Sequence, residues 1–177
     1  MIASALLLHY FACLRSSELC LDPNTGIAPL RSSVSFPSVS RMVLSVASSK
    51  TAHRGFQVHV GCSGHSICAP CTLRYYLSCF PAPPTSYLFT TSTGLPFDYQ
   101  IYNASLKSLI TRVGLDPSFN STHSLRAGSA TQAARAGLPE TQIQRLGSWR
   151  SDADKLYLRL DPSSYSQLAP HLVYQLT

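Results

Sequence analysis

The sequence predicts an α+β domain that is mainly helical and contains one small antiparallel β-sheet. Three observations support this fold class. The chain has 177 residues, 45% of them hydrophobic, which is enough for one domain with its own core. β-Branched residues and serine are concentrated between residues 34 and 60, whereas the segments on either side have helical patterns. We therefore expect a single domain that spans residues 1–177.

The chain opens with an apolar stretch of good helix formers over residues 2–14, followed by the polar group Arg15-Ser-Ser-Glu18. This pattern predicts a buried helix that ends at a charged corner. The stretch is too short to cross a bilayer and lacks the features of a signal peptide. Because the predicted helix starts without a cap, we expect that preceding sequence has been lost.

The segment rich in β-branched residues predicts three strands, over residues 34–36, 42–46 and 56–60. Apolar and polar residues alternate in them, as in a sheet with one buried face. Residues 48–55 are expected to form the turn between the last two strands. This turn carries Lys50.

Most of the remaining chain is predicted to be helical, from apolar periodicity, capping residues and glycine stops. The expected helices cover residues 67–80, 98–113, 122–136, 139–147 and 151–159, with a helical tail from residue 162. Residues 88–91 are expected to be a short strand or an extended loop. In the helix over 98–113, the apolar face is expected to comprise Ile101, Leu106, Leu109, Ile110 and Val113. Thr122 is the expected cap of the next helix and Gly137 its stop.

The charge of the chain favours a polyanionic partner. Lys and Arg together number 14 against 8 Asp and Glu, which gives a net charge of +6. Arginine dominates, since Lys50, Lys107 and Lys155 are the only lysines. A guanidinium offers a planar fork of donors that matches two phosphate oxygens, so this composition suits phosphate recognition.

The strongest local signal is His123-Ser-Leu-Arg126. Residues three apart at a helix start share one face, and the first helical turn presents free N–H groups and the positive end of the helix dipole. Such a face suits a phosphate. The alternative for an isolated motif of this kind is a surface histidine and arginine near a helix cap.

Five motifs occur in a defined order along the chain: Leu14-Arg-Ser-Ser-Glu-Leu19, Ser49-Lys-Thr51, His123-Ser-Leu-Arg126, Leu146-Gly-Ser-Trp149 and Tyr157. Together they resemble the catalytic set of the tyrosine recombinase (phage integrase) family, over nearly the whole chain. The stretch from His123 to Tyr157 looks most like the recombinases of eukaryotic mobile elements, such as DIRS-type retroelements and Cryptons. The resemblance implies DNA strand cleavage and rejoining, as in site-specific recombination or DNA integration.

The resemblance also implies a role for each motif residue. Arg15 and Arg126 would clamp the scissile phosphate, and His123 would bind the same phosphate and is a candidate for deprotonating the nucleophile. Lys50 would protonate the departing 5′-hydroxyl. Tyr157 would attack and hold the 3′-phosphate covalently.

Two further positions follow from the same resemblance. Glu18 matches the acidic residue that supports the first arginine by a salt bridge. A position usually filled by His or Trp falls on Trp149 when counted forward from Arg126, and on Ser148 when counted back from Tyr157. We favour Trp149, because its indole N–H can donate to a phosphate oxygen and a serine is shorter.

The partners implied by the resemblance are duplex DNA and, during recombination, three further copies of the chain in a homotetramer. No membrane association and no metal or nucleotide cofactor are expected. The resemblance to recombinases of eukaryotic mobile elements points to the nucleus. The N-terminal core-binding domain and the first catalytic helix of the family are expected to be absent. A catalytically inactive DNA-binding relic is the main competing interpretation.

The residues Cys62, His65, Cys68 and Cys71 raise the possibility of a zinc site, and with it a second competitor, a zinc-stabilised interaction module. The short spacing and the location at a strand-to-helix junction weigh against metal. We expect these cysteines to be small buried apolar residues. All six cysteines are expected to be reduced thiols in an intracellular compartment.

Overall fold

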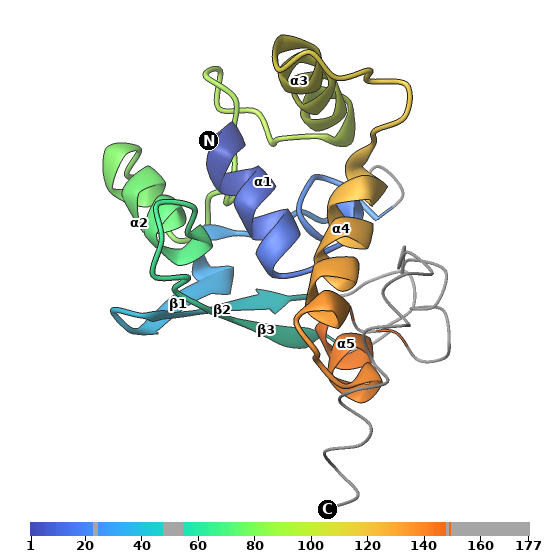
Figure 1. Ribbon diagram of the computed structural model, residues 1–177. Coiled ribbons are helices and arrows are strands. Elements are labelled where there is room, and N and C mark those ends of the chain that lie inside the picture. The colour runs from blue at the N-terminus through green and yellow to red at the C-terminus, as the bar shows by residue number, and fades with distance from the viewer. Residues whose placement is uncertain (23–24, 48–54, 148, 150–177) are drawn as a thin grey trace, which may run out of the picture. The chain divides into compact units, whose positions relative to one another are not determined.

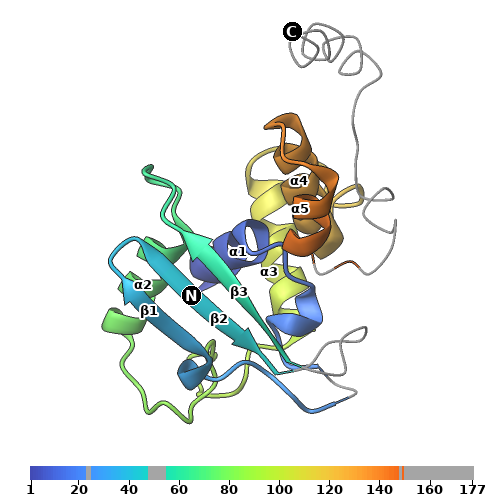
Figure 2. The same cartoon turned by 90° about the horizontal axis from the view of Figure 1, so that it is seen from below.

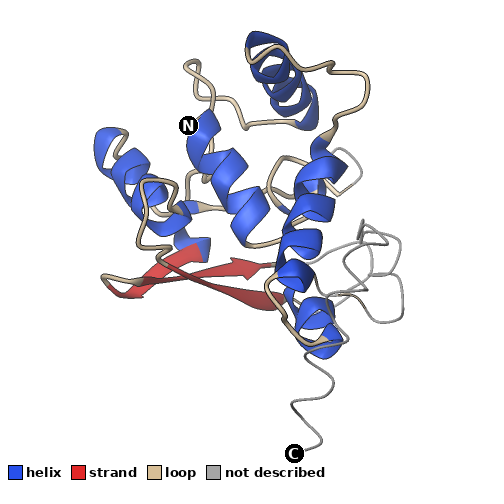
Figure 3. Ribbon diagram, viewed as in Figure 1, coloured by secondary structure: helices blue, strands red, loops and turns tan. Residues whose placement is uncertain are grey.

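The structure, a computed structural model, describes residues 1–22, 25–47, 55–147 and 149. Over these residues the chain forms five α-helices, two short 3-10 helices and one three-stranded antiparallel sheet (Figures 1 and 3). The expected α+β class with a small antiparallel sheet is confirmed. Lys50, Ser148, Tyr157 and all the predicted helices after residue 150 lie outside the described residues.

The chain divides into two compact units, Met1–Arg126 and Ala127–Thr177, here called the N-terminal unit and the C-terminal unit. Helices α1, α2 and α3 and the sheet belong to the N-terminal unit. Helix α4 begins in the N-terminal unit and continues in the C-terminal unit, which also holds α5.

The sheet has the strand order β1-β2-β3, and each neighbouring pair is antiparallel. Its strands are Val34–Ser38, Arg41–Val46 and Phe56–Gly61, so all three predicted strands are correct. In β2 the alternate residues Met42, Leu44 and Val46 are buried and belong to the main core. The intervening Val43 is also buried, so the burial in this strand follows the period of two only in part.

Helices α1 (Ile2–Phe11) and α2 (Ala69–Cys79) lie on the same face of the sheet (Figures 1 and 2). They contribute Ala5, Leu8, Ala69, Leu73 and Tyr76 to the core. Helix α1 ends earlier than the predicted boundary, because the backbone at Cys13 turns into the left-handed region. Within the described part of the chain, no helix combines the length and apolarity that a membrane crossing needs.

Helix α3 (Tyr99–Arg112) starts at Asp98, whose side chain accepts a hydrogen bond from the amide of Ile101 at 2.7 Å. Its buried residues are Tyr102 and Leu106. The predicted apolar face is wrong at both ends, because Ile101 and Val113 are exposed. Residues 88–91, expected as a short strand or an extended loop, belong to none of the three strands of the sheet, and Thr90 forms an isolated bridge with Pro96.

Helices α4 (Thr122–Arg135) and α5 (Glu140–Leu146) are close to their predicted ranges. Gly137 ends α4 in the left-handed conformation, with φ 80°, as its role as a helix stop requires. Thr122 does not have the capping role expected of it. Thr122 is already helical, and the Oγ of Ser124 accepts a hydrogen bond from the amide of Ser121 at 3.1 Å.

Candidate active site

Helix α1 ends in a Schellman motif that has cysteine in the position where α3 and α4 have glycine. The amide of Cys13 donates to the carbonyl oxygen of Tyr10, and the amide of Leu14 donates to that of His9, both at 3.1 Å. Cys13 has φ 48°, a conformation that residues with a Cβ rarely adopt. This turn leads the chain out of the buried helix to Arg15.

Arg15 and Glu18 form an ion pair at the first turn after this bend. The Nη1 of Arg15 lies 2.8 Å from Oε1 of Glu18, and the backbone amide of Arg15 donates to Oε2 at 2.7 Å. The Glu18 side chain is 2% exposed and that of Arg15 is 21% exposed. A buried carboxylate therefore holds a guanidinium that still reaches the surface.

The first turn of α4 carries His123 and Arg126, which differ in burial. His123 is exposed, whereas Arg126 is only 2% exposed. The Nη1 of Arg126 donates to the carbonyl oxygen of Cys13. In the other direction, the Sγ of Cys13 donates to the backbone carbonyl of Arg126 at 3.7 Å. These contacts attach the second arginine to the segment that carries Arg15, although the two are 111 positions apart in the sequence.

A buried histidine that is not among the predicted site residues lies beside this arginine. His9, in α1, is 1% exposed, and its Nδ1 lies 2.7 Å from the hydroxyl of Tyr102. Burial, followed by the positive charge of Arg126, lowers the pKa of His9 from 6.5 to about 4. Burial also raises the pKa of Tyr102. The signal in the sequence was a single histidine inside an apolar helix.

Trp149 lies in the C-terminal unit, where its position depends on Gly147. Its amide donates to the carbonyl oxygen of Gln144 at 2.9 Å, and the residue is 9% exposed. A Cβ added at Gly147 would overlap the Cε3, Cζ3 and Cη2 atoms of the Trp149 ring. The Leu-Gly pair before Trp149 therefore has a physical reason, because the indole fills the space that a side chain at residue 147 would need.

The structure brings together four of the predicted site residues. All four belong to the N-terminal unit. Arg15 caps the 3-10 helix Ser16–Glu18 that follows α1, Glu18 ends that helix, and His123 and Arg126 lie at the start of α4. Trp149 belongs to the other unit. Lys50, Ser148 and Tyr157 lie outside the described residues.

The four residues of the N-terminal unit form a cationic group with oriented guanidinium groups. The acceptors include a carboxylate for Arg15 and a backbone carbonyl for Arg126. A guanidinium carries five N–H donors in a planar fork that can bind two phosphate oxygens. Two oriented guanidinium groups beside a helix start are suited to a phosphate diester.

The fold described above is that of tyrosine recombinases, which are the structural neighbours of this chain at 13–19% sequence identity. No family profile matches the sequence, and no curated protein matches it either. The neighbours share the mixture of helices with a small antiparallel sheet.

Three of these structures illustrate the likeness. The XerA recombinase superposes with a TM-score of 0.71 at 19% identity, over 96% of this chain and 62% of its own. The XerH site-specific recombinase, in a post-cleavage complex with its difH substrate, superposes with a TM-score of 0.70 at 16% identity. The match covers 94% of this chain and 44% of XerH. The Tn1549 transposon integrase, in complex with circular intermediate DNA, superposes with a TM-score of 0.63 at 16% identity. The match covers 93% of this chain and 55% of the integrase chain. This chain thus spans less than two thirds of each of these proteins.

Proposed function

We propose that this chain cuts and rejoins duplex DNA through a covalent 3′-phosphotyrosine intermediate formed by Tyr157. The observation that carries the proposal is the hydrogen bond from Arg126 to the carbonyl oxygen of Cys13. It joins the motif His123-Ser-Leu-Arg126, at the start of α4, to the segment that carries Arg15. Arg15 lies two residues after Cys13. The likeness in fold to tyrosine recombinases supports the same conclusion.

In the proposed reaction, Arg15, Arg126 and His123 bind the non-bridging oxygens of the scissile phosphate. Negative charge that builds up on these oxygens is stabilised by the fixed guanidinium groups. The Tyr157 oxygen attacks phosphorus and gives up its proton, for which His123 is the candidate acceptor. The bond to the 5′-oxygen breaks, and Lys50 supplies the proton that this oxygen takes up.

Rejoining is the reverse of this step, because the phosphotyrosine keeps the energy of the broken diester bond. Trp149 is the proposed further donor to a phosphate oxygen, in preference to Ser148. Glu18 is a positioning residue, since its contact is with Arg15 and not with the phosphate.

The burial of Arg126 sets a requirement on this reaction. A side chain that is 2% exposed does not reach a phosphate in solution. The proposal therefore requires that DNA binding uncovers part of this guanidinium while its bond to Cys13 holds it in place.

The wider setting is also part of the proposal. Motifs between His123 and Tyr157 support an origin in a eukaryotic mobile element, and thus action in the nucleus on duplex DNA. Strand exchange between two duplexes would take place in a tetramer of this chain. The net charge of +6 is consistent with a nucleic-acid partner.

The same burial of Arg126 favours a second candidate function. In it, the chain is a relic that keeps the fold and binds DNA through its basic residues but no longer cleaves it. Binding would then fall steeply with salt, because phosphate contacts dominate.

The test is a covalent-trapping assay on a nicked duplex. Cleavage of this duplex releases a short fragment that carries the 5′-hydroxyl, so that rejoining is prevented. We expect the wild-type chain to form a protein–DNA adduct that survives denaturation. Arg15→Ala should abolish the adduct, because a phosphate clamp is lost. Arg112→Ala is the matched control, since it removes an exposed arginine from the last turn of α3.

The two candidate functions give different results in this assay. Adduct formation by the wild type and by Arg112→Ala, but not by Arg15→Ala, supports the recombinase. DNA binding by the wild type without any adduct supports the relic. An adduct formed equally by Arg15→Ala contradicts the proposed site.

A further inference from the structure

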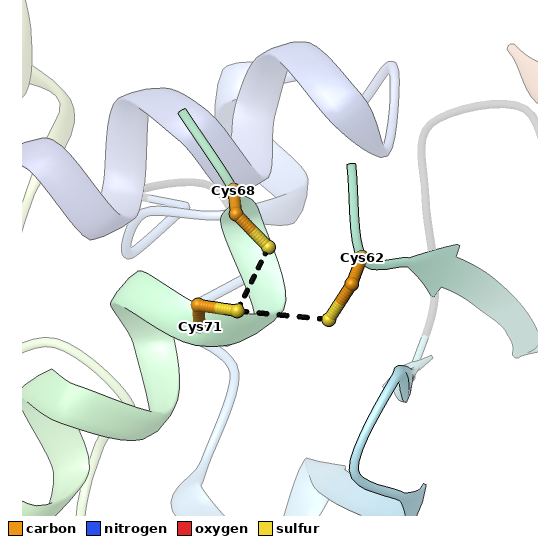
Figure 4. A group of neighbouring side chains, drawn as sticks. All are labelled: Cys62, Cys68 and Cys71. Atoms are coloured by element: carbon orange, nitrogen blue, oxygen red, sulfur yellow. Dashed lines mark hydrogen bonds between the residues drawn. The ribbon is translucent and has the colours of Figure 1, made fainter. Parts of the chain in front are cut away.

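Three cysteine sulfurs converge at the junction between β3 and α2 (Figure 4). Cys62 directly follows β3, Cys68 is the N-cap residue of α2, and Cys71 lies in the first turn of that helix. The Sγ atoms of Cys68 and Cys71 are 3.0 Å apart, and those of Cys62 and Cys71 are 3.6 Å apart. All three lie within 4.8 Å of one another.

The short connection from Cys62 to Cys68 is folded back on itself by its own hydrogen bonds. The Oγ of Ser63 donates to the carbonyl oxygen of Ile67 at 2.7 Å and accepts from the amide of His65 at 3.2 Å. Gly64 supports the bend with φ 74°. The sulfurs therefore meet because the loop closes, which the sequence spacing alone did not reveal.

The exposure of these cysteines does not fit a purely apolar packing role. Cys68 is buried as expected, but Cys62 is only partly buried and Cys71 is exposed. The expectation that all of them are small buried residues is therefore wrong for these two. All three are free thiols.

The spacing of the sulfurs fits a tetrahedral metal ion. Zinc–sulfur bonds of about 2.3 Å place two sulfurs of a tetrahedral site roughly 3.8 Å apart. The separations of 3.0 and 3.6 Å need only small side-chain movements to reach this value. Thiolate ligands select zinc over magnesium or calcium, which prefer oxygen.

Two sources of positive potential lie near the cluster. The first turn of α2 presents backbone N–H groups and the positive end of the helix dipole to Cys68 and Cys71. The Nη2 of Arg74 donates to the carbonyl oxygen of Val39 at 3.1 Å, and the Sγ of Cys62 contacts the same oxygen at 3.7 Å. A guanidinium thus lies beside the cluster.

We propose that Cys62, Cys68 and Cys71 bind one Zn²⁺ ion as thiolates, with a water molecule as the fourth ligand. No fourth histidine, cysteine or carboxylate joins the three sulfurs among the residues that the structure describes. The exposed side of Cys71 leaves room for water. Binding releases the three thiol protons and part of the hydration shell of the ion, and no oxidation takes place. The ion fastens the end of β3 to the start of α2, independently of the proposed DNA chemistry.

The test uses the complete chain, kept reduced and freed of metal by a chelator. Titration with Zn²⁺ against a chromophoric chelator should give one equivalent per chain. Co²⁺ should give the visible absorption bands of a tetrahedral ion together with near-ultraviolet charge-transfer bands from thiolates. Zinc X-ray absorption should show three sulfur neighbours at about 2.3 Å.

Three variants decide which side chains are ligands. Cys71→Ser should lose stoichiometric binding and the cobalt charge-transfer bands. Cys79→Ser, an exposed cysteine near the other end of α2, and His65→Ala, in the same connection, should keep both. Far-ultraviolet circular dichroism verifies that each variant is folded, and the X-ray absorption of the wild type provides a test that does not depend on any variant.

The proposal is overturned if the wild type binds no stoichiometric Zn²⁺, or if Cys71→Ser binds it with unchanged affinity. It is also overturned if the absorption data show a nitrogen ligand and His65→Ala loses the ion, since the site would then not be a three-thiolate site.

Discussion

The guanidinium of Arg126 donates a hydrogen bond from Nη1 to the carbonyl oxygen of Cys13, which lies two residues before Arg15. The bond spans 113 positions in the sequence and is buried. Its acceptor is a backbone atom, so this bond depends on the path of the chain at the end of α1 and not on the identity of the side chain at residue 13. The predictions on Arg126 and Cys13 follow from this contact.

The first prediction is that Arg126→Lys slows DNA cleavage without a comparable loss of DNA binding. An ammonium keeps the charge but cannot hold the Cys13 carbonyl and two phosphate oxygens with a planar fork of donors. The loss of one fixed donor is typically worth about 10² to 10³ in rate. Single-turnover rates on the nicked duplex measure the effect. Arg135→Lys, in the last turn of the same helix, is the control. A cleavage rate within about threefold of the wild type would contradict the role of the guanidinium fork.

The second prediction compares two substitutions of Cys13. Cys13→Gly keeps the backbone carbonyl and suits φ 48°, and it removes only the long thiol contact of 3.7 Å to the Arg126 carbonyl, so adduct formation should stay close to that of the wild type. Cys13→Val places a β-branched side chain in the left-handed region, at a cost of about 1–3 kcal/mol. It should lower the free energy of unfolding and slow adduct formation. Denaturant unfolding and trapping assays measure both effects. A valine variant that is as stable as the glycine variant would contradict the backbone strain expected for a β-branched side chain at residue 13.

The third prediction concerns acid stability and His9. Its pKa is about 4 in the folded chain, where burial and Arg126 disfavour the charged form, against 6.5 for the unfolded chain. Between these values the unfolded chain binds the proton and the folded chain does not. The free energy of unfolding therefore rises with pH in this window. The contribution of neutral His9 is lost as the pH falls from 6.5 towards 4. The loss amounts to roughly 3 kcal/mol for a shift of this size.

The measurement for His9 is the free energy of unfolding as a function of pH. His9→Asn keeps a group that can hydrogen-bond Tyr102 but does not titrate, so its curve should be flatter than that of the wild type between pH 6.5 and 4. His59→Asn replaces a histidine on an exposed position of β3 and should leave the wild-type slope unchanged. Equal slopes for the wild type and His9→Asn would show that His9 is not the titrating group.

The fourth prediction is that Gly147→Ala displaces Trp149. The added Cβ overlaps the indole ring, so the ring must move towards solvent. Trp149 is the only tryptophan of the chain, and its fluorescence emission should shift to longer wavelength. Gly61→Ala is the control, because a Cβ there has open space and the residue has no positive φ. An unchanged emission maximum in Gly147→Ala would argue against the packing of the indole on this glycine.

Elements with strong local patterns could be predicted from the sequence. The alternation in residues 42–46 predicts strand β2, and Gly137 marks the end of α4. The start of α3 at Asp98 follows from its capping side chain. In each case the physical cause lies within a few residues of the element itself.

Features that depend on distant contacts could not be predicted. Apolar periodicity selected Ile101 and Val113 for the buried face of α3, but the helix buries Tyr102, which contacts His9 across 93 positions. The end of α1 depends on a left-handed cysteine that no propensity predicts. The spacing of His123 and Arg126, and the resemblance for Arg15 and Glu18, identified these residues as candidates. Neither identified the Cys13 carbonyl as the acceptor that links Arg126 to the segment of Arg15.

The most direct test of the proposed function is the identity of the nucleophile, because Tyr157 is the defining residue of the reaction. Other tyrosines offer alternatives, among them Tyr75, Tyr76, Tyr165 and Tyr174, but only Tyr157 lies 31 residues after Arg126 and eight after Trp149. Trapping on the nicked duplex should give a covalent adduct with the wild type and with Tyr165→Phe. Tyr157→Phe removes one hydroxyl with little change in volume, so it should bind DNA as before and form no adduct. An adduct formed by Tyr157→Phe at a rate comparable to the wild type would contradict the account.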